Sequence, residues 1–118
     1  MKGRNNMKEL INGYMYDTDK SKLIAKVYGP YIFEDERQWN EALYQTQDGK
    51  FFLKGDGGPR SKYYDNPALI PYGFGDAEFW YREQLDNVYT AYDITKAKDP
   101  DPNYNTFCRL FKDKEEAE

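Results

Sequence analysis

Histidine is absent from this 118-residue chain, and cysteine occurs once, as Cys108. Without histidine, the chain lacks the side chain that most often serves as general base or metal ligand near neutral pH. Cys108 cannot form an internal disulfide and has no histidine to activate its thiol. Carboxylates are common, but none stands alone in an apolar stretch that would raise its pKa. We therefore expect a protein that is not an enzyme and that has no cofactor and no metal site.

Long apolar runs and clustered basic residues are also missing. No apolar stretch approaches the roughly 20 residues that a membrane-spanning helix needs. The N-terminal segment MKGRNNMKEL lacks the apolar core of a secretory signal. The formal net charge of −4 disfavours nucleic acid as the main ligand, because phosphate binding depends on clustered Lys and Arg. These absences, with the single cysteine, predict a cytoplasmic protein with no membrane partner.

Aromatic residues, in contrast, are abundant: twelve Tyr, seven Phe and two Trp. So many rings argue against global disorder, and the length suits a single domain with its own core. Tyr packs its ring and keeps its hydroxyl in water, so these residues either build interfaces or serve as half-buried strand residues. The expected single domain, 1–118, comprises a frayed N-terminus 1–7, a core 8–95, an Asp/Pro loop 98–103, a C-terminal strand or arm 104–112 and a tail 113–118.

The strongest local signal is a central hairpin over residues 43–54. Asp48-Gly49 between two β-favouring stretches is typical of a two-residue type I′ turn. This turn pairs Thr46 with Phe51, and side chains alternate between the two faces along each strand. The face expected in the core then holds Tyr44, Thr46, Phe51 and Leu53, while the other holds Leu43, Gln45 and Phe52. Phe52 indicates that the second face is packed as well.

The flanking segments complete an α+β fold, in which a small, mostly antiparallel sheet is packed with two helices. One helix is expected over residues 17–28, because Leu23, Ile24 and Val27 form one helical stripe. The other begins at 75–76 and continues toward residue 92 with a bend near 86–87. Short strands are expected at 9–11, 14–16 and 68–70, and Pro71 and Gly73 end the last of them. The sequence of residues 31–40 fits a strand, a short helix or a loop. The core is expected to hold Phe51, Leu53, Leu23, Val27 and Trp80.

Asp17-x-Asp19-x-Ser21 resembles the first half of a calcium-binding loop. Such a loop also needs Gly at its sixth position and Glu at its twelfth. Lys22 and Tyr28 occupy those positions, so we interpret the motif as a helix cap.

The glycine loop 55–58 follows a predicted strand, as phosphate-binding loops do. A phosphate cradle needs a helix N-terminus directly after the loop, which the following sequence PRSK does not provide. The glycines are therefore expected to provide positive φ and close backbone approach. Arg60 and Lys62 make the loop locally basic, which leaves weak anion contact open.

Several short motifs, each occurring once, are spread over residues 10–81. They are Ile11-Asn12-Gly13, Tyr16-Asp17-Thr18, Leu43-Tyr44-x-Thr46-x-x-Gly49-x-Phe51-Phe52-Leu53-x-Gly55-x-Gly57-Gly58-x-x-Ser61-Lys62-Tyr63, Ile70-Pro71 and Ala77-x-x-Trp80. In these motifs the chain resembles a group of small accessory proteins from phages, plasmids and conjugative elements of Gram-positive bacteria. Residues 31–40 fit the group loosely, and residues 87–118 depart from its short tails.

The resembled group includes anti-CRISPR proteins, which inhibit Cas nucleases, and members with no assigned role. The resemblance implies a non-catalytic inhibitor that binds a bacterial defence protein, expected to be a Cas effector, in the host cytoplasm. The alternative is a nucleic-acid or nucleotide-binding accessory protein, supported by Arg60, Lys62 and the glycines. The residues expected to contact the partner are Glu34, Asp35, Glu36, Arg60, Lys62, Tyr63, Tyr64, Tyr89 and Tyr92.

Overall fold

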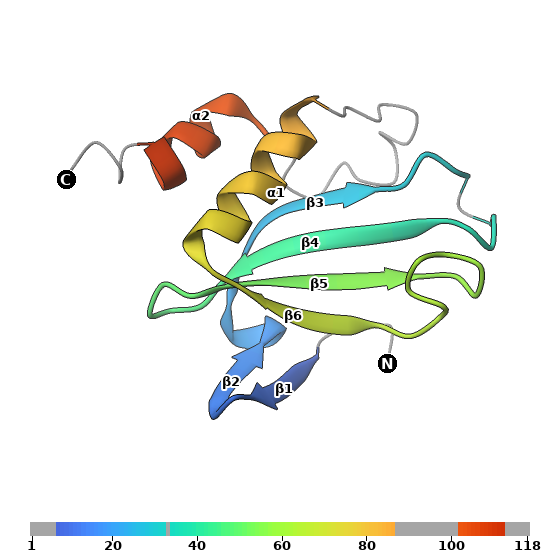
Figure 1. Ribbon diagram of the computed structural model, residues 1–118, viewed down its shortest axis with the longest axis horizontal. Coiled ribbons are helices and arrows are strands. Elements are labelled where there is room, and N and C mark those ends of the chain that lie inside the picture. Colours follow the sequence, from blue (N-terminus) through green and yellow to red (C-terminus); the bar gives the residue numbers. More distant parts are fainter. Residues whose placement is uncertain (1–6, 33, 87–101, 113–118) are drawn as a thin grey trace.

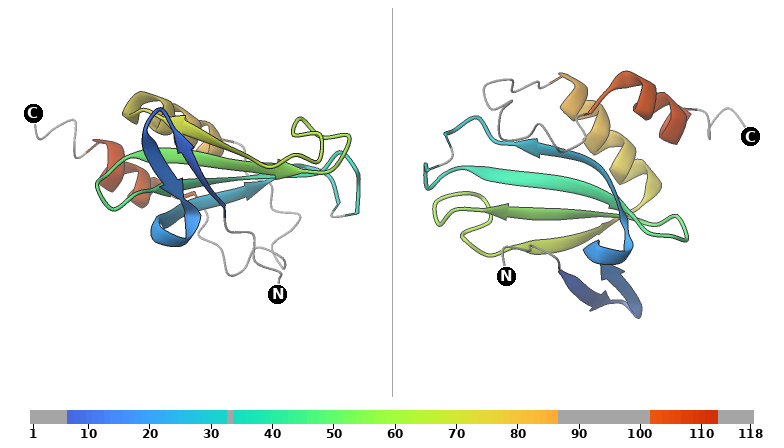
Figure 2. Two further views of the ribbon diagram at one scale, coloured as in Figure 1. Left: turned by 90° about the horizontal axis from the view of Figure 1, so that it is seen from below. Right: turned by 180° about the vertical axis from the view of Figure 1, so that it is seen from behind.

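A computed structural model of the chain describes residues 7–32, 34–86 and 102–112. Four antiparallel strands form a sheet in the order β3-β4-β5-β6, and β1 and β2 form a separate hairpin. Helix α1 lies along one face of the sheet (Figure 1 and the left view of Figure 2), which confirms the predicted α+β fold. The elements are β1 Lys8–Ile11, β2 Tyr14–Asp17, the 3₁₀ turn η1 Thr18–Lys20, β3 Lys22–Tyr28, β4 Trp39–Gln45, β5 Phe51–Gly57, β6 Ala68–Tyr72, α1 Phe74–Asp86, α2 Tyr104–Phe107 and the π-helical turn η3 Cys108–Lys112.

The first hairpin forms as predicted. Asn12 and Gly13 connect β1 to β2, and both have positive φ, 52° and 81°, as a type I′ turn requires. Met7 precedes β1 and was expected to belong to a frayed terminus. Its carbonyl instead accepts a hydrogen bond of 2.9 Å from the Thr18 N–H, and its own N–H donates to Thr18 Oγ1 over 2.8 Å. These bonds hold the start of β1 against η1.

The central hairpin forms, but its predicted register is wrong by one residue. Gln45 pairs with Phe51, and Tyr44 pairs with Phe52. The turn is wider than two residues because the Thr46 hydroxyl accepts the Lys50 N–H at 2.9 Å, and only Gly49 has positive φ.

The one-residue shift changes which side chains share a face. Phe51 and Leu53 face α1 together with Leu43, so the expected core positions of Phe51 and Leu53 are confirmed. Tyr44 and Phe52 lie on the opposite face, where their rings stack with centroids 5.2 Å apart. Phe52 is fully buried, so the expected packing on the second face is also confirmed.

The predicted helix over 17–28 is wrong. Asp17 caps only the turn η1, accepting the Asp19 N–H at 2.9 Å, and the chain then enters β3. Leu23, Ile24 and Val27 fit both a helical stripe and a strand, and pairing with β4 selects the strand. An irregularity between Leu23 and Ala25 interrupts the register. Ile24 and Val27 reach the core, whereas Leu23 is half-buried, contrary to its predicted core position.

The remaining elements differ from prediction mainly at their ends. Strand β6 continues through Pro71 to Tyr72; as the edge strand of its sheet, it tolerates a proline that cannot donate a hydrogen bond. Helix α1 begins at Phe74, just before the predicted start, and Asp76 accepts the Gly73 N–H at 3.0 Å. Residues 31–32 and 34–38 form an irregular connection before β4.

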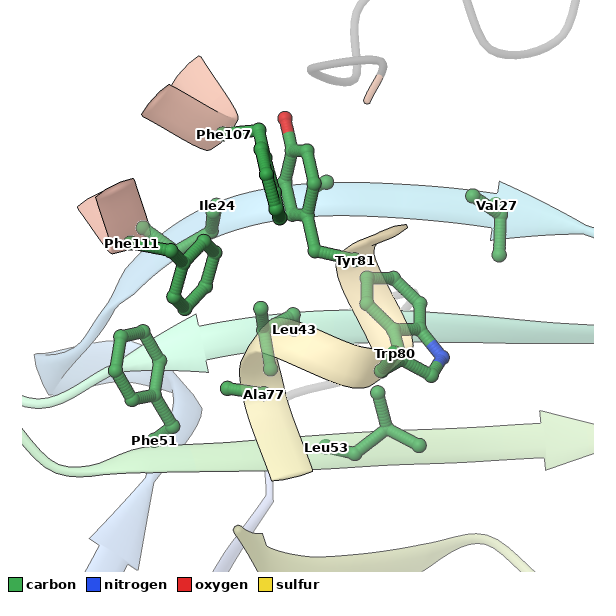
Figure 3. Close-up of a cluster of buried hydrophobic side chains, with 11 residues drawn as sticks. Ile24, Val27, Leu43, Phe51, Leu53, Ala77, Trp80, Tyr81, Phe107 and Phe111 are labelled. Carbon is green, nitrogen blue, oxygen red and sulfur yellow. The ribbon is translucent and has the colours of Figure 1, made fainter. Parts of the chain in front are cut away.

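Residues 104–112 were predicted to be a strand or an arm; they are helical, so the strand is wrong. Phe107 and Phe111 lie four residues apart, so both face the same side of the segment. They pack on α1, where their rings lie 6.0 Å and 5.8 Å from the ring of Tyr81. Val27, Trp80 and these aromatic side chains belong to the main core, shown in Figure 3, as predicted for Val27 and Trp80.

Several sequence predictions fall on residues outside the described ranges. They concern the frayed residues 1–6, the continuation of the second helix after residue 86, most of the Asp/Pro loop 98–103 and the tail 113–118.

The packing around Phe51 generates the first prediction. Phe51→Ala should lower the free energy of unfolding by about 3–5 kcal/mol, because the ring is buried against Phe111. Phe79→Ala is the matched control: the Phe79 side chain is 59% exposed, and its loss should change stability by less than about 0.5 kcal/mol. Urea unfolding followed by tryptophan fluorescence measures both. A loss below about 1 kcal/mol for Phe51→Ala would contradict the described core.

Candidate protein-binding surface

Two loops meet at one end of the sheet, on the right in Figure 1: residues 29–38 between β3 and β4, and residues 58–67 between β5 and β6. Their backbones are joined directly. The Gly58 N–H donates to the Gln38 carbonyl at 2.9 Å, and the Arg60 N–H donates to the Glu36 carbonyl at 2.9 Å. A Cβ atom at Gly58 would lie 2.5 Å from the Glu36 carbonyl oxygen. We call the two loops together the loop end.

The glycine loop serves close approach, as predicted, but not positive φ. None of Gly55, Gly57 and Gly58 has positive φ. A Cβ atom at Gly57 would overlap the Ser61 side chain, and one at Gly55 would overlap the Tyr63 ring. The glycines therefore make room for side chains of the loop that follows them.

Tyr64 is the most exposed of the large hydrophobic side chains that the structure describes in the loop end, with 77% of its surface accessible. Tyr64 and Asp65 both adopt the left-handed backbone region, with φ of 52° and 60°. A tyrosine rarely adopts this conformation, which costs about 1–3 kcal/mol and persists only where neighbouring contacts impose it. Here the Tyr64 N–H donates to the Ser61 carbonyl at 3.1 Å, and the Asp65 N–H to the Gly58 carbonyl at 3.0 Å. The loop thus fixes an exposed aromatic ring on a strained backbone.

The loop end brings together most of the side chains that the sequence predicted at a partner surface. Glu34, Asp35 and Glu36 lie on the first loop, and Arg60, Lys62, Tyr63 and Tyr64 lie on the second. The last two predicted residues, Tyr89 and Tyr92, lie outside the described ranges.

The Asp35 carboxylate is hydrogen-bonded within its own loop. Its carboxylate accepts hydrogen bonds from the Arg37 side chain, at 3.0 Å from Nε and 2.7 Å from Nη2, and from the Arg37 N–H at 2.8 Å. These bonds lower the pKa of Asp35 to about 2. The Arg37 guanidinium also lies 4.4 Å from the centre of the Tyr31 ring. Asp35 therefore shapes the loop more than it offers charge to a partner.

Glu41 on β4 lies behind the loop end and was not predicted as a site residue. One carboxylate oxygen accepts the Tyr63 hydroxyl at 2.6 Å and the Lys62 ammonium at 2.8 Å. The other accepts the Trp80 indole N–H at 2.9 Å. Only 8% of the Glu41 side chain is accessible. The carboxylate thus joins the sheet, helix α1 and the second loop. We call these four residues the Glu41 cluster.

The Glu41 cluster is a structural network and a poor catalytic one. Burial raises the pKa of Glu41, but hydrogen bonds from Lys62, Trp80 and Tyr63 outweigh burial, and the net pKa lies below its ordinary value of 4.5. Burial and then the Glu41 carboxylate raise the pKa of Tyr63. A carboxylate with a lowered pKa is a weak base, and a tyrosine with a raised pKa is a weak acid. This arrangement favours a fixed loop over proton transfer.

Residues 7–32, 34–86 and 102–112 contain no group of three or more Asp, Glu, Cys or His side chains placed to hold a metal ion. Within the same ranges, no helix is long and apolar enough to span a membrane.

Neither a family model, nor a curated protein, nor a solved structure matches this chain. The resemblance to proteins of mobile genetic elements therefore stays a prediction. A proposed function has to be argued from the residues of the loop end.

The Glu41 cluster generates a prediction about pH. Because the folded-state pKa of Glu41 is lowered, its stabilising effect is fully present above the ordinary pKa and is lost as pH falls through the folded pKa. Glu41→Gln should lower the free energy of unfolding by about 2–3 kcal/mol at pH 7, because a neutral amide replaces a carboxylate that accepts three hydrogen bonds. The stability difference between wild type and variant should shrink between about pH 5 and pH 3.

The measurement is urea unfolding at several pH values. Glu78→Gln is the control, because Glu78 pairs with Arg82 four residues further along α1, and the Arg82 side chain is 51% exposed. Such a pair contributes little to stability. A stability difference for Glu41→Gln that stays constant from pH 7 to pH 3 would contradict the described network.

Proposed function

We propose that this protein is a non-catalytic, protein-binding inhibitor, and that the loop end is its contact surface. The observation that carries the proposal is Tyr64, an exposed aromatic ring held on a left-handed backbone by loop hydrogen bonds. Residual strain at an exposed position points to a functional constraint. Tyrosine is also enriched among the few residues that dominate binding energies at protein interfaces.

The charges of the loop end indicate what kind of surface it would meet. Lys62 is paired with Glu41, and Arg37 is paired with Asp35. The charges that remain on the two loops are those of Glu34, Glu36, Asp65 and Arg60, and all four side chains are exposed. Three carboxylates against one guanidinium favour a basic partner surface, which would also speed association.

A Cas effector fits this description, because nucleases that hold guide and target strands present basic channels. The sequence resemblance to a group that includes anti-CRISPR proteins leads to the same class of partner. The proposal is therefore a mobile-element inhibitor that occupies a Cas effector in equal stoichiometry. The alternative, nucleic-acid binding, is less well supported, because Lys62 is paired with Glu41 and Arg37 with Asp35, so that Arg60 is the remaining cation among the described residues of the two loops.

The proposal predicts stoichiometric inhibition that depends on Tyr64. Purified effectors of several CRISPR types are titrated with the protein in a DNA or RNA cleavage assay. Inhibition of at least one type should saturate near one equivalent. Tyr64→Ala should weaken the inhibition at least about tenfold, because an interface hot spot is lost while the Cβ atom and the backbone are kept.

Tyr104→Ala is the matched control. Tyr104 is 63% exposed on α2, at the opposite end of the molecule from the two loops (Figure 1), so its removal should leave inhibition unchanged. Failure to inhibit any effector, or inhibition at trace amounts that shows turnover, would overturn the proposal. A shift of free DNA or RNA in a gel, without inhibition, would support the nucleic-acid alternative.

A further inference from the structure

Lys54 is a basic residue in the middle of the sheet. It lies on β5, which pairs with β4 on one side and with β6 on the other (Figure 1). Side chains alternate along a strand, and Leu53 faces α1, so Lys54 lies on the opposite face together with Phe52. The cross-strand neighbours of Lys54 are Ala42 on β4 and Leu69 on β6. Neither neighbour has a side chain that can accept a hydrogen bond from an ammonium group.

The Lys54 side chain is buried without a partner. Only 7% of the residue is exposed. Within residues 7–32, 34–86 and 102–112, its ammonium group makes no hydrogen bond and no ion pair. Every fully enclosed side-chain nitrogen in the same ranges has a hydrogen-bond partner, so the Nζ atom of Lys54 is not fully enclosed. The aliphatic stem is therefore covered, while Nζ stays within reach of a small molecule.

This environment favours the neutral amine over the ammonium ion. Burial is the main cause of the lowered pKa of Lys54. Asp56, two residues further along β5, opposes the lowering, and Lys26 on β3 adds to it. Lys26 pairs with Ala42, which in turn pairs with Lys54, so the two lysines lie in one row across the sheet. A neutral amine is a nucleophile, whereas an ammonium ion is not.

We propose that Lys54 is a carbamate-forming residue, whose amine reversibly binds carbon dioxide. The lone pair of Nζ forms a bond to the carbon of CO₂, and one carbon–oxygen π pair moves onto an oxygen atom. One proton leaves Nζ for water, so the product is a carbamate with a single negative charge, and no electron is gained or lost. Carbon dioxide is small, neutral and apolar, which suits an amine whose stem is enclosed between apolar neighbours.

The carbamate would lie in the same row as the positive charge of Lys26. Two strand spacings, about 10 Å, separate the two backbones, and the small Ala42 side chain between them leaves room for both tips. The Lys26 ammonium also lies 5.3 Å from the centre of the Tyr28 ring, and its attraction for the carbamate requires only its charge. Lys54 lies outside the loop end, so carbamate formation is a property separate from the proposed function.

The test uses ¹³C-labelled bicarbonate, which equilibrates with carbon dioxide, and ¹³C NMR spectra of the protein from neutral to mildly alkaline pH. We expect a carbamate resonance in the wild type and its loss in Lys54→Arg, which keeps a positive charge but has no free amine. Because the pKa of Lys54 is lowered, this resonance should appear at lower pH than those of exposed lysines.

Lys22→Arg is the matched control, because Lys22 lies exposed on β3 and its loss should leave the Lys54 resonance unchanged. Resonances common to all three proteins belong to other amines, among them the α-amino group. A second measurement needs no variant: triethyloxonium ion alkylates carbamates in the wild type, and mass spectrometry of its peptides then locates the trapped group. We expect the trapped group on Lys54.

Equal carbamate resonances in the wild type and Lys54→Arg would overturn the inference. So would trapped groups that map to exposed lysines and not to Lys54. Either result leaves the Tyr64 cleavage titration unaffected, because that assay does not involve Lys54. Conversely, a carbamate on Lys54 together with no inhibition of any effector would support this site and overturn the proposed function.

Discussion

The position of the loop end depends on the Glu41 carboxylate. It accepts hydrogen bonds from Trp80 of α1 and from Tyr63 and Lys62 of the second loop, while its own backbone belongs to β4. A buried carboxylate is tolerated only when such partners replace water. Because these partners come from separate parts of the chain, helix, sheet and loop are held in one arrangement. Gly55 allows this arrangement by leaving room for the Tyr63 ring.

The same network determines which side chains of the loop end remain accessible. It uses Lys62 and Tyr63 internally and leaves Tyr64 exposed beside acidic side chains. A partner would meet a surface whose loops are already positioned by backbone hydrogen bonds between them. Such preorganisation reduces the entropy lost on binding.

The sequence predicted the architecture better than the details that depend on tertiary contacts. The α+β class and the hairpins follow from turn chemistry, which is local. The close backbone approach at the glycine loop was likewise predicted from the residue type. The helix over 17–28 was predicted wrongly because its apolar residues fit both periodicities, and pairing with β4 decided between them. The central register was missed because the Thr46 hydroxyl widens the turn. The wrong register also concealed the role of Glu41. Side chains alternate along β4, so Glu41 lies on the same face as Leu43, which is the core face. A carboxylate is acceptable there only because folding supplies its hydrogen-bond partners.

The proposal that the loop end binds the partner protein can be tested by quantitative affinity purification. Tagged wild-type protein and a Glu34→Lys/Glu36→Lys variant are each incubated with lysate of a bacterium that carries a CRISPR–Cas system, and bound proteins are measured by mass spectrometry. We expect an effector subunit to co-purify with the wild type in near-equimolar amount and to be lost from the variant, because lysines would repel a basic surface. Equal recovery of the effector by both proteins, or its absence from both, would contradict the claim.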